Sequence, residues 1–124
     1  MSNLCKPRQL GATDIHVSPV ALGCWPIAGM TSIDVNDTDS LATLEAAVDA
    51  GVTFFDTAYG YGAKGESERL IAKALGHRRN ELAIATKCGM HWNDQLERTF
   101  DARPEIIKRQ CDESLQRLKT DRVE

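Results

Sequence analysis

Short apolar runs and stretches with helical spacing alternate along the chain. The runs have the length and composition of buried strands, and in the stretches between them apolar residues recur every three or four positions. The strands are predicted at 20–23, 52–55 and 82–86, and the helices at about 39–50, 67–75 and 104–118. A βα unit repeated three times favours a parallel sheet with helices packed outside it.

Polar residues and glycines mark the expected helix ends. The first helix has candidate N-caps at 37–39 and a glycine, Gly51, at the position after its end. Ser67 is the expected cap of the second helix, which Gly76 ends. Pro104 suits the first turn of the third helix. On the three helices we expect buried apolar faces, and the residues that define the first and third are Leu41, Leu44 and Val48, then Ile107, Cys111, Leu115 and Leu118.

The remaining segments complete the picture of a partial barrel. Residues 7–19 read as a small hairpin around a turn at 11–14, residues 89–102 as a polar loop, and residues 121–124 as the approach to a fourth strand. A sheet of so few strands has open edges and uncovered faces. We therefore expect either the first half of a larger barrel or a chain that is completed by a partner or by self-association.

Composition and charge narrow the class of protein. With 124 residues, 42% apolar and 27% charged, the chain is expected to form one globular domain over residues 1–124. A net charge of −3 argues against nucleic acid as a partner, and no apolar stretch approaches the length of a membrane span or a secretory signal, so a cytoplasmic location is expected. The scattered cysteines predict neither a metal site nor disulfides but small buried side chains, and they are Cys5, Cys24, Cys88 and Cys111.

The segment FFDTAYGYGAKGESE contains the pattern G-x-G-x-x-G at Gly60, Gly62 and Gly65. A dinucleotide-binding loop would place its first glycine directly after the strand and an acidic residue at the end of the next strand. Here three residues separate Asp56 from Gly60, and the next strand ends at Lys87. We interpret the glycines as a flexible turn between strand and helix.

Three residues beside those glycines carry more chemical information. Asp56 and Lys87 follow neighbouring apolar runs, and because adjacent strands lie about 4.8 Å apart, the two side chains can form an ion pair. Tyr61 can fold back over the same strand end. A cation beside a phenol favours its ionised form, so the trio can supply a proton to a carbonyl oxygen as hydride arrives. The alternative is an Asp56–Lys87 salt bridge that only closes the sheet, with Tyr61 as a surface aromatic.

Along its whole length the chain resembles the aldo-keto reductase family. The resemblance rests on RQLGATDIHVSPVALGCW, DAGVTFFDTAYGYG with SERLIAKAL, IATK and RPEIIKRQCDESLQRLKTDRVE, in the family's order and spacing. The family motif D-T-A-x-x-Y is matched by Asp56, Thr57, Ala58 and Tyr61. The resemblance implies a (β/α)₈ TIM barrel, of which this chain would be the amino-terminal portion, and NADP(H)-dependent reduction of small aldehydes or ketones to alcohols.

The resemblance also implies a role for each matching residue. Tyr61 would be the general acid and base, Lys87 would assist the release of its proton, and Asp56 would pair with Lys87 and approach the nicotinamide ribose. In the family, the segment that matches Gly23, Cys24 and Trp25 lies beside the nicotinamide and the substrate. A core role for Cys24 or Trp25 is the alternative.

Other parts of the family's machinery are not matched. The family's catalytic histidine lies a few residues beyond the position of Val123–Glu124, and its phosphate-binding loops belong to the second half of the barrel. His16, His77 and His91 do not match that histidine, and His91 is read as a loop residue. Three hypotheses stay open: a carbonyl reductase, a non-catalytic fragment or subunit that needs a partner chain, and a self-contained α/β binding module.

Overall fold

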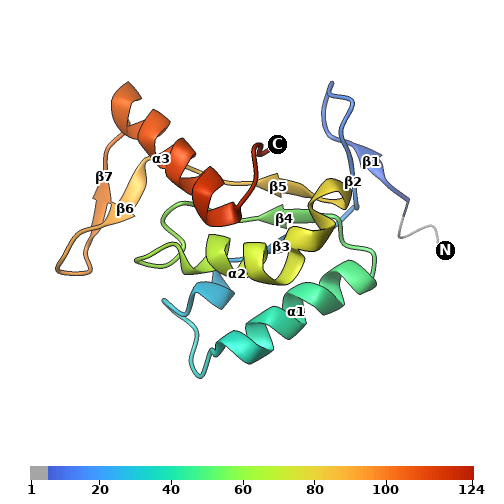
Figure 1. The fold of residues 1–124 in the computed structure, drawn as a ribbon, viewed down its shortest axis with the longest axis horizontal. Helices are drawn as coiled ribbons and strands as arrows, with labels where there is room; N and C mark the ends of the chain where they lie inside the picture. The colour runs from blue at the N-terminus through green and yellow to red at the C-terminus, as the bar shows by residue number, and fades with distance from the viewer. Residues whose placement is uncertain (1–5) are drawn as a thin grey trace.

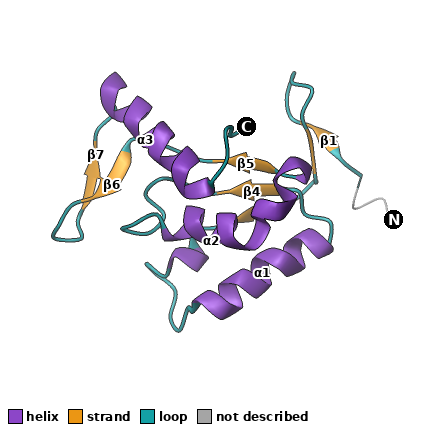
Figure 2. Ribbon diagram, in the orientation of Figure 1, coloured by secondary structure: helices purple, strands orange, loops and turns teal. Residues whose placement is uncertain are grey.

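A computed structural model of the chain describes residues 6–124; Cys5 lies outside the described residues. Its centre is a parallel sheet in the order β3-β4-β5, made of β3 (Ala21–Gly23), β4 (Phe54–Asp56) and β5 (Ala83–Ala85). Helix α1 (Asp37–Asp49) connects β3 to β4, α2 (Glu66–Leu75) connects β4 to β5, and α3 (Pro104–Leu118) follows β5. Figures 1 and 2 show α2 lying between α1 and α3, with the strands behind them. The predicted βα repeat is confirmed.

The core lies between the sheet and the helices. Phe55 at the centre of β4 is fully buried and belongs to one apolar cluster with Leu44 of α1 and Ile71 and Leu75 of α2. The fully buried thiol-bearing Cys24 is part of the same cluster. Burial of a large aliphatic or aromatic side chain contributes about 1.5–3 kcal/mol, so this cluster is what holds α1 and α2 on the sheet.

Two predicted helix caps are corrected. The side chain of Asn36, one residue before the predicted range, accepts the backbone N–H of Asp39 and caps α1. Helix α2 begins after Gly65, and Ser67 lies inside its first turn with no capping bond. The hydroxyl of Ser67 is instead committed to contacts in the core, described below. Gly51 has φ +93°, a left-handed conformation that favours glycine, and so ends α1 as predicted.

The segment after β5 is not a plain loop as predicted. It forms an antiparallel hairpin of β6 (Met90–Trp92) and β7 (Arg98–Phe100), which stands apart from the main sheet in Figure 1. Strands of three residues are too short for an alternation of apolar and polar positions to reveal them in a sequence. The predicted amino-terminal hairpin is confirmed, with β1 (Arg8–Gln9) paired to β2 (His16–Val17).

The buried face of helix α3 includes Leu118 as predicted, but the other three residues predicted for that face are not fully buried. Ile107, Cys111 and Leu115 are only half-buried. The fully buried positions are Gln110, Ser114 and Leu118. Gln110 accepts the backbone N–H of Gly89 through its side-chain oxygen, so a polar contact to the segment after β5 takes the place of an apolar one.

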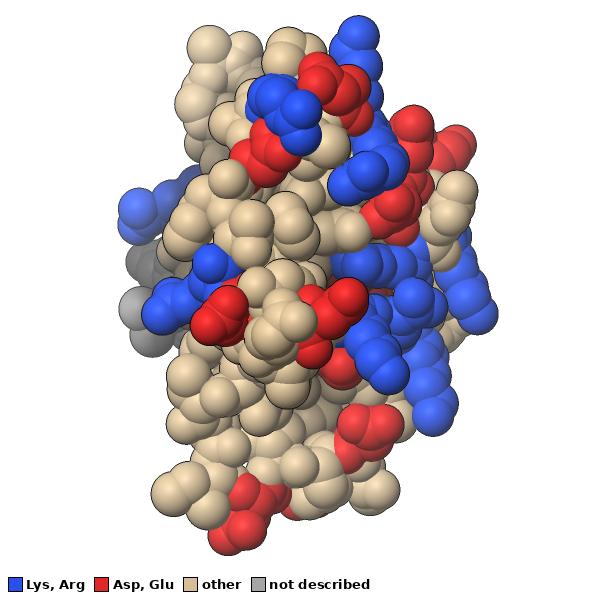
Figure 3. All heavy atoms as spheres, turned by 90° about the vertical axis from the view of Figure 1, so that its left-hand side faces the viewer, with Lys and Arg blue, Asp and Glu red and all other residues tan. Residues whose placement is uncertain are grey.

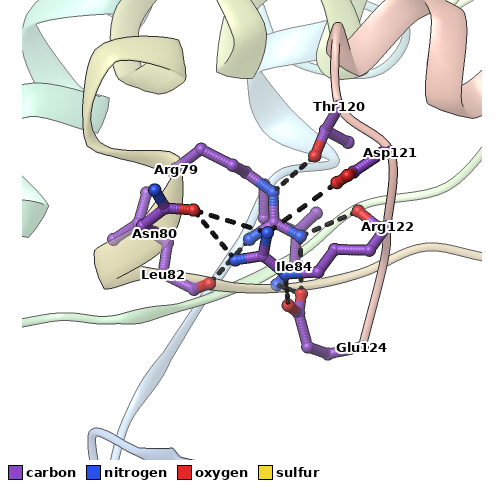
Figure 4. Close-up of polar contacts among 8 residues, drawn as sticks. All are labelled: Arg79, Asn80, Leu82, Ile84, Thr120, Asp121, Arg122 and Glu124. Atoms are coloured by element: carbon purple, nitrogen blue, oxygen red, sulfur yellow. Dashed lines mark hydrogen bonds and ion pairs between the residues drawn. The ribbon is translucent and has the colours of Figure 1, made fainter.

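The last residues run beside β5. The backbone N–H of Glu124 donates to the carbonyl of Ile84 at 3.0 Å, which fits the predicted approach to a fourth strand. The carboxylate of Glu124 accepts the N–H of Ile84 at 2.9 Å and bonds Arg79 at 2.8 Å (Figure 4). Arg79 comes from a short 3₁₀ helix, η3 (Gly76–Glu81), and also bonds the carbonyl of Arg122. Side chains therefore fasten this segment to the sheet edge.

Candidate functional site

Three strand ends meet at one edge of the sheet. Gly23, Asp56 and Ala85 are register partners across β3, β4 and β5, and Lys87 lies two residues beyond Ala85. The carboxylate of Asp56 and the ammonium group of Lys87 form an ion pair at 2.5 Å. Open α/β sheets bind ligands at this carboxyl edge of the strands.

Tyr61 lies above the ion pair. The ammonium group of Lys87 is 3.2 Å from the Tyr61 hydroxyl and 4.7 Å from the centre of its ring, and it also donates to the carbonyl of Thr57 at 2.8 Å. Burial lowers the pKa of Lys87, but the hydrogen bonds and charges of Asp56 and Tyr61 outweigh it, so the pKa is raised from its usual 10.5. Lys87 is therefore a fixed cation held against the phenol oxygen.

This ion pair lies close to water. The side chains of Lys87 and Asp56 are 49% and 43% exposed. Ion pairs at that exposure contribute about 0–1 kcal/mol to stability. The pair adds little to the fold, and its clearest consequence is the placement of a cation beside Tyr61.

Gly23 ends β3, Cys24 and Trp25 follow it, and the three residues lie in different surroundings. Gly23 is exposed and has open space where a side chain would stand. The ring of Trp25 meets the ring of Tyr61 edge-on at a centroid distance of 5.1 Å. The thiol of Cys24 is fully buried, and its pKa is raised to about 12 by burial and by the charge of Asp56, against the opposing effect of Lys87. The thiol has the core position named as the alternative above.

A pocket of about 510 Å³ opens beside Tyr61 and Lys87. One wall is the β6–β7 hairpin, which is held to the Tyr61 loop because the indole N–H of Trp92 donates to the carbonyl of Gly60 at 2.8 Å. Phe100 of the hairpin lines the pocket although the residue is 75% exposed. The lining is mainly apolar: Ala58, Gly60, Tyr61, Lys87, Cys88, Gly89, Met90, Phe100, Asp101 and Ala102.

The three glycines form the predicted turn between β4 and α2. Gly62 and Gly65 have φ of +95° and +72°. At Gly60 space matters instead, because a Cβ there would stand 2.5 Å from the side chain of Met90 and 2.9 Å from its backbone oxygen. The glycines let the chain turn and let the hairpin approach closely.

Sequence reasoning missed the polar contacts behind this turn. Ser67 Oγ lies 2.8 Å from Thr57 Oγ1 and donates to the carbonyl of Cys24 at 2.9 Å. Glu68, also fully buried, accepts the hydroxyl of Thr86 at 2.7 Å. The signal available in the sequence was two polar residues on the otherwise apolar inward face of α2, because buried polar groups require partners.

Other side chains of this region bear on function less directly. His91 lies in β6 opposite Thr99 and not in a loop.

Within residues 6–124, no three His, Cys, Asp or Glu side chains are grouped so as to hold a metal ion, and no helix is long and apolar enough to cross a membrane. Cys24, Cys88 and Cys111 are free thiols. Figure 3 views the molecule from the side on which the β6–β7 hairpin lies in Figure 1, and shows Lys and Arg side chains gathered along the right of this face, with acidic groups among them.

Comparison with known proteins identifies relatives of this chain in sequence. Residues 19–124 match the sequence profile described as the aldo/keto reductase family. Aldo-keto reductase YhdN of Bacillus subtilis is 36% identical over 94% of this chain and 35% of its own length. L-galactose dehydrogenase of Arabidopsis thaliana is also 36% identical, with 94% and 35% covered.

Solved structures agree. A putative aldo-keto reductase from Pseudomonas aeruginosa superimposes with a TM-score of 0.83 at 31% identity, covering 98% of this chain and 46% of that one. The glycerol dehydrogenase of Gluconobacter oxydans gives 0.82 at 33% identity, covering 95% and 37%. The chain thus spans 35–46% of the length of these relatives.

The fold predicted from the sequence is confirmed by these matches. Parallel βα units with this superposition are the amino-terminal portion of a (β/α)₈ barrel, and the described residues form no closed barrel. The motif residues that suggested the resemblance, Asp56, Tyr61 and Lys87, all lie within the matched range. The chain belongs to the aldo/keto reductase family.

Proposed function

We propose that the protein carrying this chain reduces aldehydes or ketones to alcohols with NADP(H). The carrying observation is the contact of the Tyr61 hydroxyl with the Lys87 ammonium group at 3.2 Å, next to an apolar pocket. A proton donor must lie within hydrogen-bond reach of the oxygen it protonates. A carbonyl group entering the pocket can meet the phenol there.

The proton and the cation have separate roles in this proposal. Tyr61 gives its proton to the carbonyl oxygen as the carbonyl carbon becomes an alcohol carbon. Lys87 stabilises the phenolate that is left, because an ammonium ion beside the oxygen favours its negative form. Asp56 and the carbonyl of Thr57 hold the ammonium group in place, at 2.5 and 2.8 Å.

The strand ends beside Tyr61 fit a nicotinamide cofactor. Gly23 is exposed with open space above it, and it is the register partner of Asp56, whose half-exposed carboxylate can accept a ribose hydroxyl. Gly23 and the backbone of Cys24, with Asp56, would hold the nicotinamide end, and Trp25 would border it. When bound, NADP(H) supplies the hydride. A cytoplasmic location, where this cofactor is abundant, is part of the same proposal.

The variant Tyr61→Phe in the complete protein tests the role of the phenol. We expect carbonyl reduction to fall by at least about 10²-fold, the usual contribution of general acid catalysis, while NADPH binding measured by fluorescence is kept. Tyr59→Phe is the comparison, because it removes the chain's other phenol, which donates to Glu113 on α3 and not toward Lys87. Full turnover by Tyr61→Phe would refute the assignment.

We also propose, as an alternative, a non-catalytic chain that pairs with another polypeptide. It is supported by β3, an edge strand of the sheet among the described residues, with the exposed Val20 directly before it. Unpaired strand edges recruit further strands. NADPH titration and size-exclusion chromatography of the 124-residue chain separate the two functions: assembly without NADPH binding supports the alternative, and a monomer that binds NADPH tightly contradicts it.

A further inference from the structure

A second ion pair lies behind the candidate site, between α2 and α3. The Glu68 carboxylate and the Arg117 guanidinium approach to 3.3 Å, and their side chains are 0% and 12% exposed. The Asp56–Lys87 pair described above is about half exposed. Of these two ion pairs, the Glu68–Arg117 pair is the one whose side chains have less freedom to move.

Each partner of this buried pair reaches one of the two segments that form the site. Glu68 Oε1 accepts the hydroxyl of Thr86, the residue directly before Lys87, at 2.7 Å. Arg117 Nη1 donates to the carbonyl of Tyr59, two residues before Tyr61, at 2.9 Å. The two segments are also joined directly, because the N–H of Tyr59 donates to the carbonyl of Lys87 at 2.9 Å. Together these contacts form a closed circuit that joins α2, α3 and the two backbone segments. Those segments carry the phenol of Tyr61 and the amine of Lys87.

The guanidinium of Arg117 is held on several sides. Its central carbon, Cζ, lies over the Tyr59 ring, 4.0 Å from the centre of that ring. It passes the N-cap of α2 at Gly65, where an added Cβ would stand 2.6 Å from its side chain. The Tyr59 hydroxyl is in turn bonded to Glu113 on α3 at 2.5 Å. Arginine suits such a place, because its planar group donates in fixed directions and stacks on aromatic rings.

A buried ion pair is weak evidence for added stability, because desolvation of the two charges offsets their attraction. The pair can still matter by fixing the positions of nearby groups, because a displacement of about 1 Å at reacting groups can lower a reaction rate by roughly 10²-fold. We propose that Glu68 and Arg117 are positioning residues, which hold Tyr61 within hydrogen-bond reach of Lys87 by fixing the segments on either side. The inference rests on the proposed function only for its effect on turnover; the geometric effect can be measured without it.

The geometric test uses the 124-residue chain labelled with ¹³C-tyrosine. It contains only two tyrosines, so the ring signals of Tyr59 and Tyr61 are assigned with one Tyr→Phe variant each. In Glu68→Gln and in Arg117→Lys we expect the Tyr61 signal to shift or broaden, since its ring loses its fixed place beside Lys87. Tyr59 touches Arg117 and will respond in any case, so only Tyr61 is diagnostic.

The matched control is Arg79→Lys. Arg79 and Glu124 form an ion pair of similar burial, both 11% exposed, which ties η3 to the last residues of the chain (Figure 4). That pair has no contact with Tyr61 or Lys87 among the bonds of the described residues. We expect the Tyr61 signal to keep its position in Arg79→Lys, even where the chain loses stability.

In the complete protein, Glu68→Gln and Arg117→Lys are expected to lower kcat by about 10- to 100-fold while KM changes far less, because the lost interaction concerns geometry at the reacting groups. Arg79→Lys is expected to leave both constants unchanged. If Glu68→Gln does not fold, the double variant Glu68→Leu/Arg117→Leu removes both charges and is measured instead, with the same change in the Tyr61 signal expected. An unmoved Tyr61 signal in folded variants overturns the inference. Absence of any carbonyl reduction by the unsubstituted protein overturns the proposed function alone.

Discussion

The Glu124 carboxylate offers the sharpest test of how the last segment is fastened to the sheet. It accepts the N–H of Ile84 at 2.9 Å, a guanidinium N–H of Arg79 at 2.8 Å and one of Arg122 at 3.1 Å. Glu124→Gln keeps the shape of the side chain but removes its charge. It also replaces one acceptor oxygen by an NH₂ group, which faces the N–H donors of Ile84 and the arginines. Loss of charged hydrogen bonds at 11% exposure is expected to cost about 2–3 kcal/mol of unfolding free energy at pH 7.

The pH dependence of this loss follows from the pKa of Glu124. Burial raises that pKa, but the Ile84 N–H and the two arginines outweigh it, so it lies below the usual 4.5. A lowered pKa in the folded state gives stability that is fully present above pH 4.5 and is lost as the pH falls through the folded value. The difference between Glu124→Gln and the parent chain should therefore shrink on acidification below pH 4.5.

Urea unfolding at pH 7 and at pH 3, read as the shift in midpoint at constant slope, measures both effects. Hydrogen exchange of the Ile84 amide gives a local reading, because that N–H loses its acceptor. Glu81→Gln is the comparison: Glu81 pairs with Arg78 at the surface, is 58% exposed, and should change stability far less. A Glu124→Gln effect as small as that of Glu81→Gln, or one independent of pH, would refute the reasoning.

Two further predictions concern the site. Gly60→Ala should destabilise the chain by about 1–3 kcal/mol, because the added Cβ meets the backbone oxygen of Met90 at 2.9 Å, and thermal unfolding with the hairpin's amide signals would register it. Cys24, with a pKa of about 12, should resist iodoacetamide at pH 8 while the chain is folded and react only after unfolding; alkylation of Cys24 in the native chain, found by mass spectrometry, would contradict its buried position.

The sequence predicted the sheet and the contact between Asp56 and Lys87 for separate reasons. Apolar runs such as 52–55 are local signals of strands, and they were read correctly. The contact of Asp56 with Lys87 followed from topology, because parallel neighbouring strands end at the same edge. Neither inference required knowledge of any particular side-chain conformation.

What the sequence did not reveal depends on contacts between distant residues. The inward face of α3 carries Gln110 and Ser114, and a polar residue is recognised as buried only once its partner is known. The same holds for Ser67, which looks like a helix cap locally but is bonded to Thr57 and to the carbonyl of Cys24. The β6–β7 hairpin was missed because each strand has only three residues, too few for an alternation of apolar and polar positions to be recognised.

The two tryptophans of the chain give the site an internal optical reporter. Trp25 meets the ring of Tyr61, and the indole N–H of Trp92 donates to the carbonyl of Gly60, so both indoles touch the short loop that bears the phenol. Intrinsic emission of the chain therefore follows that loop from two sides, one indole in a ring contact and the other in a hydrogen bond. A rearrangement of this loop can therefore be followed by intrinsic tryptophan fluorescence, without an attached label.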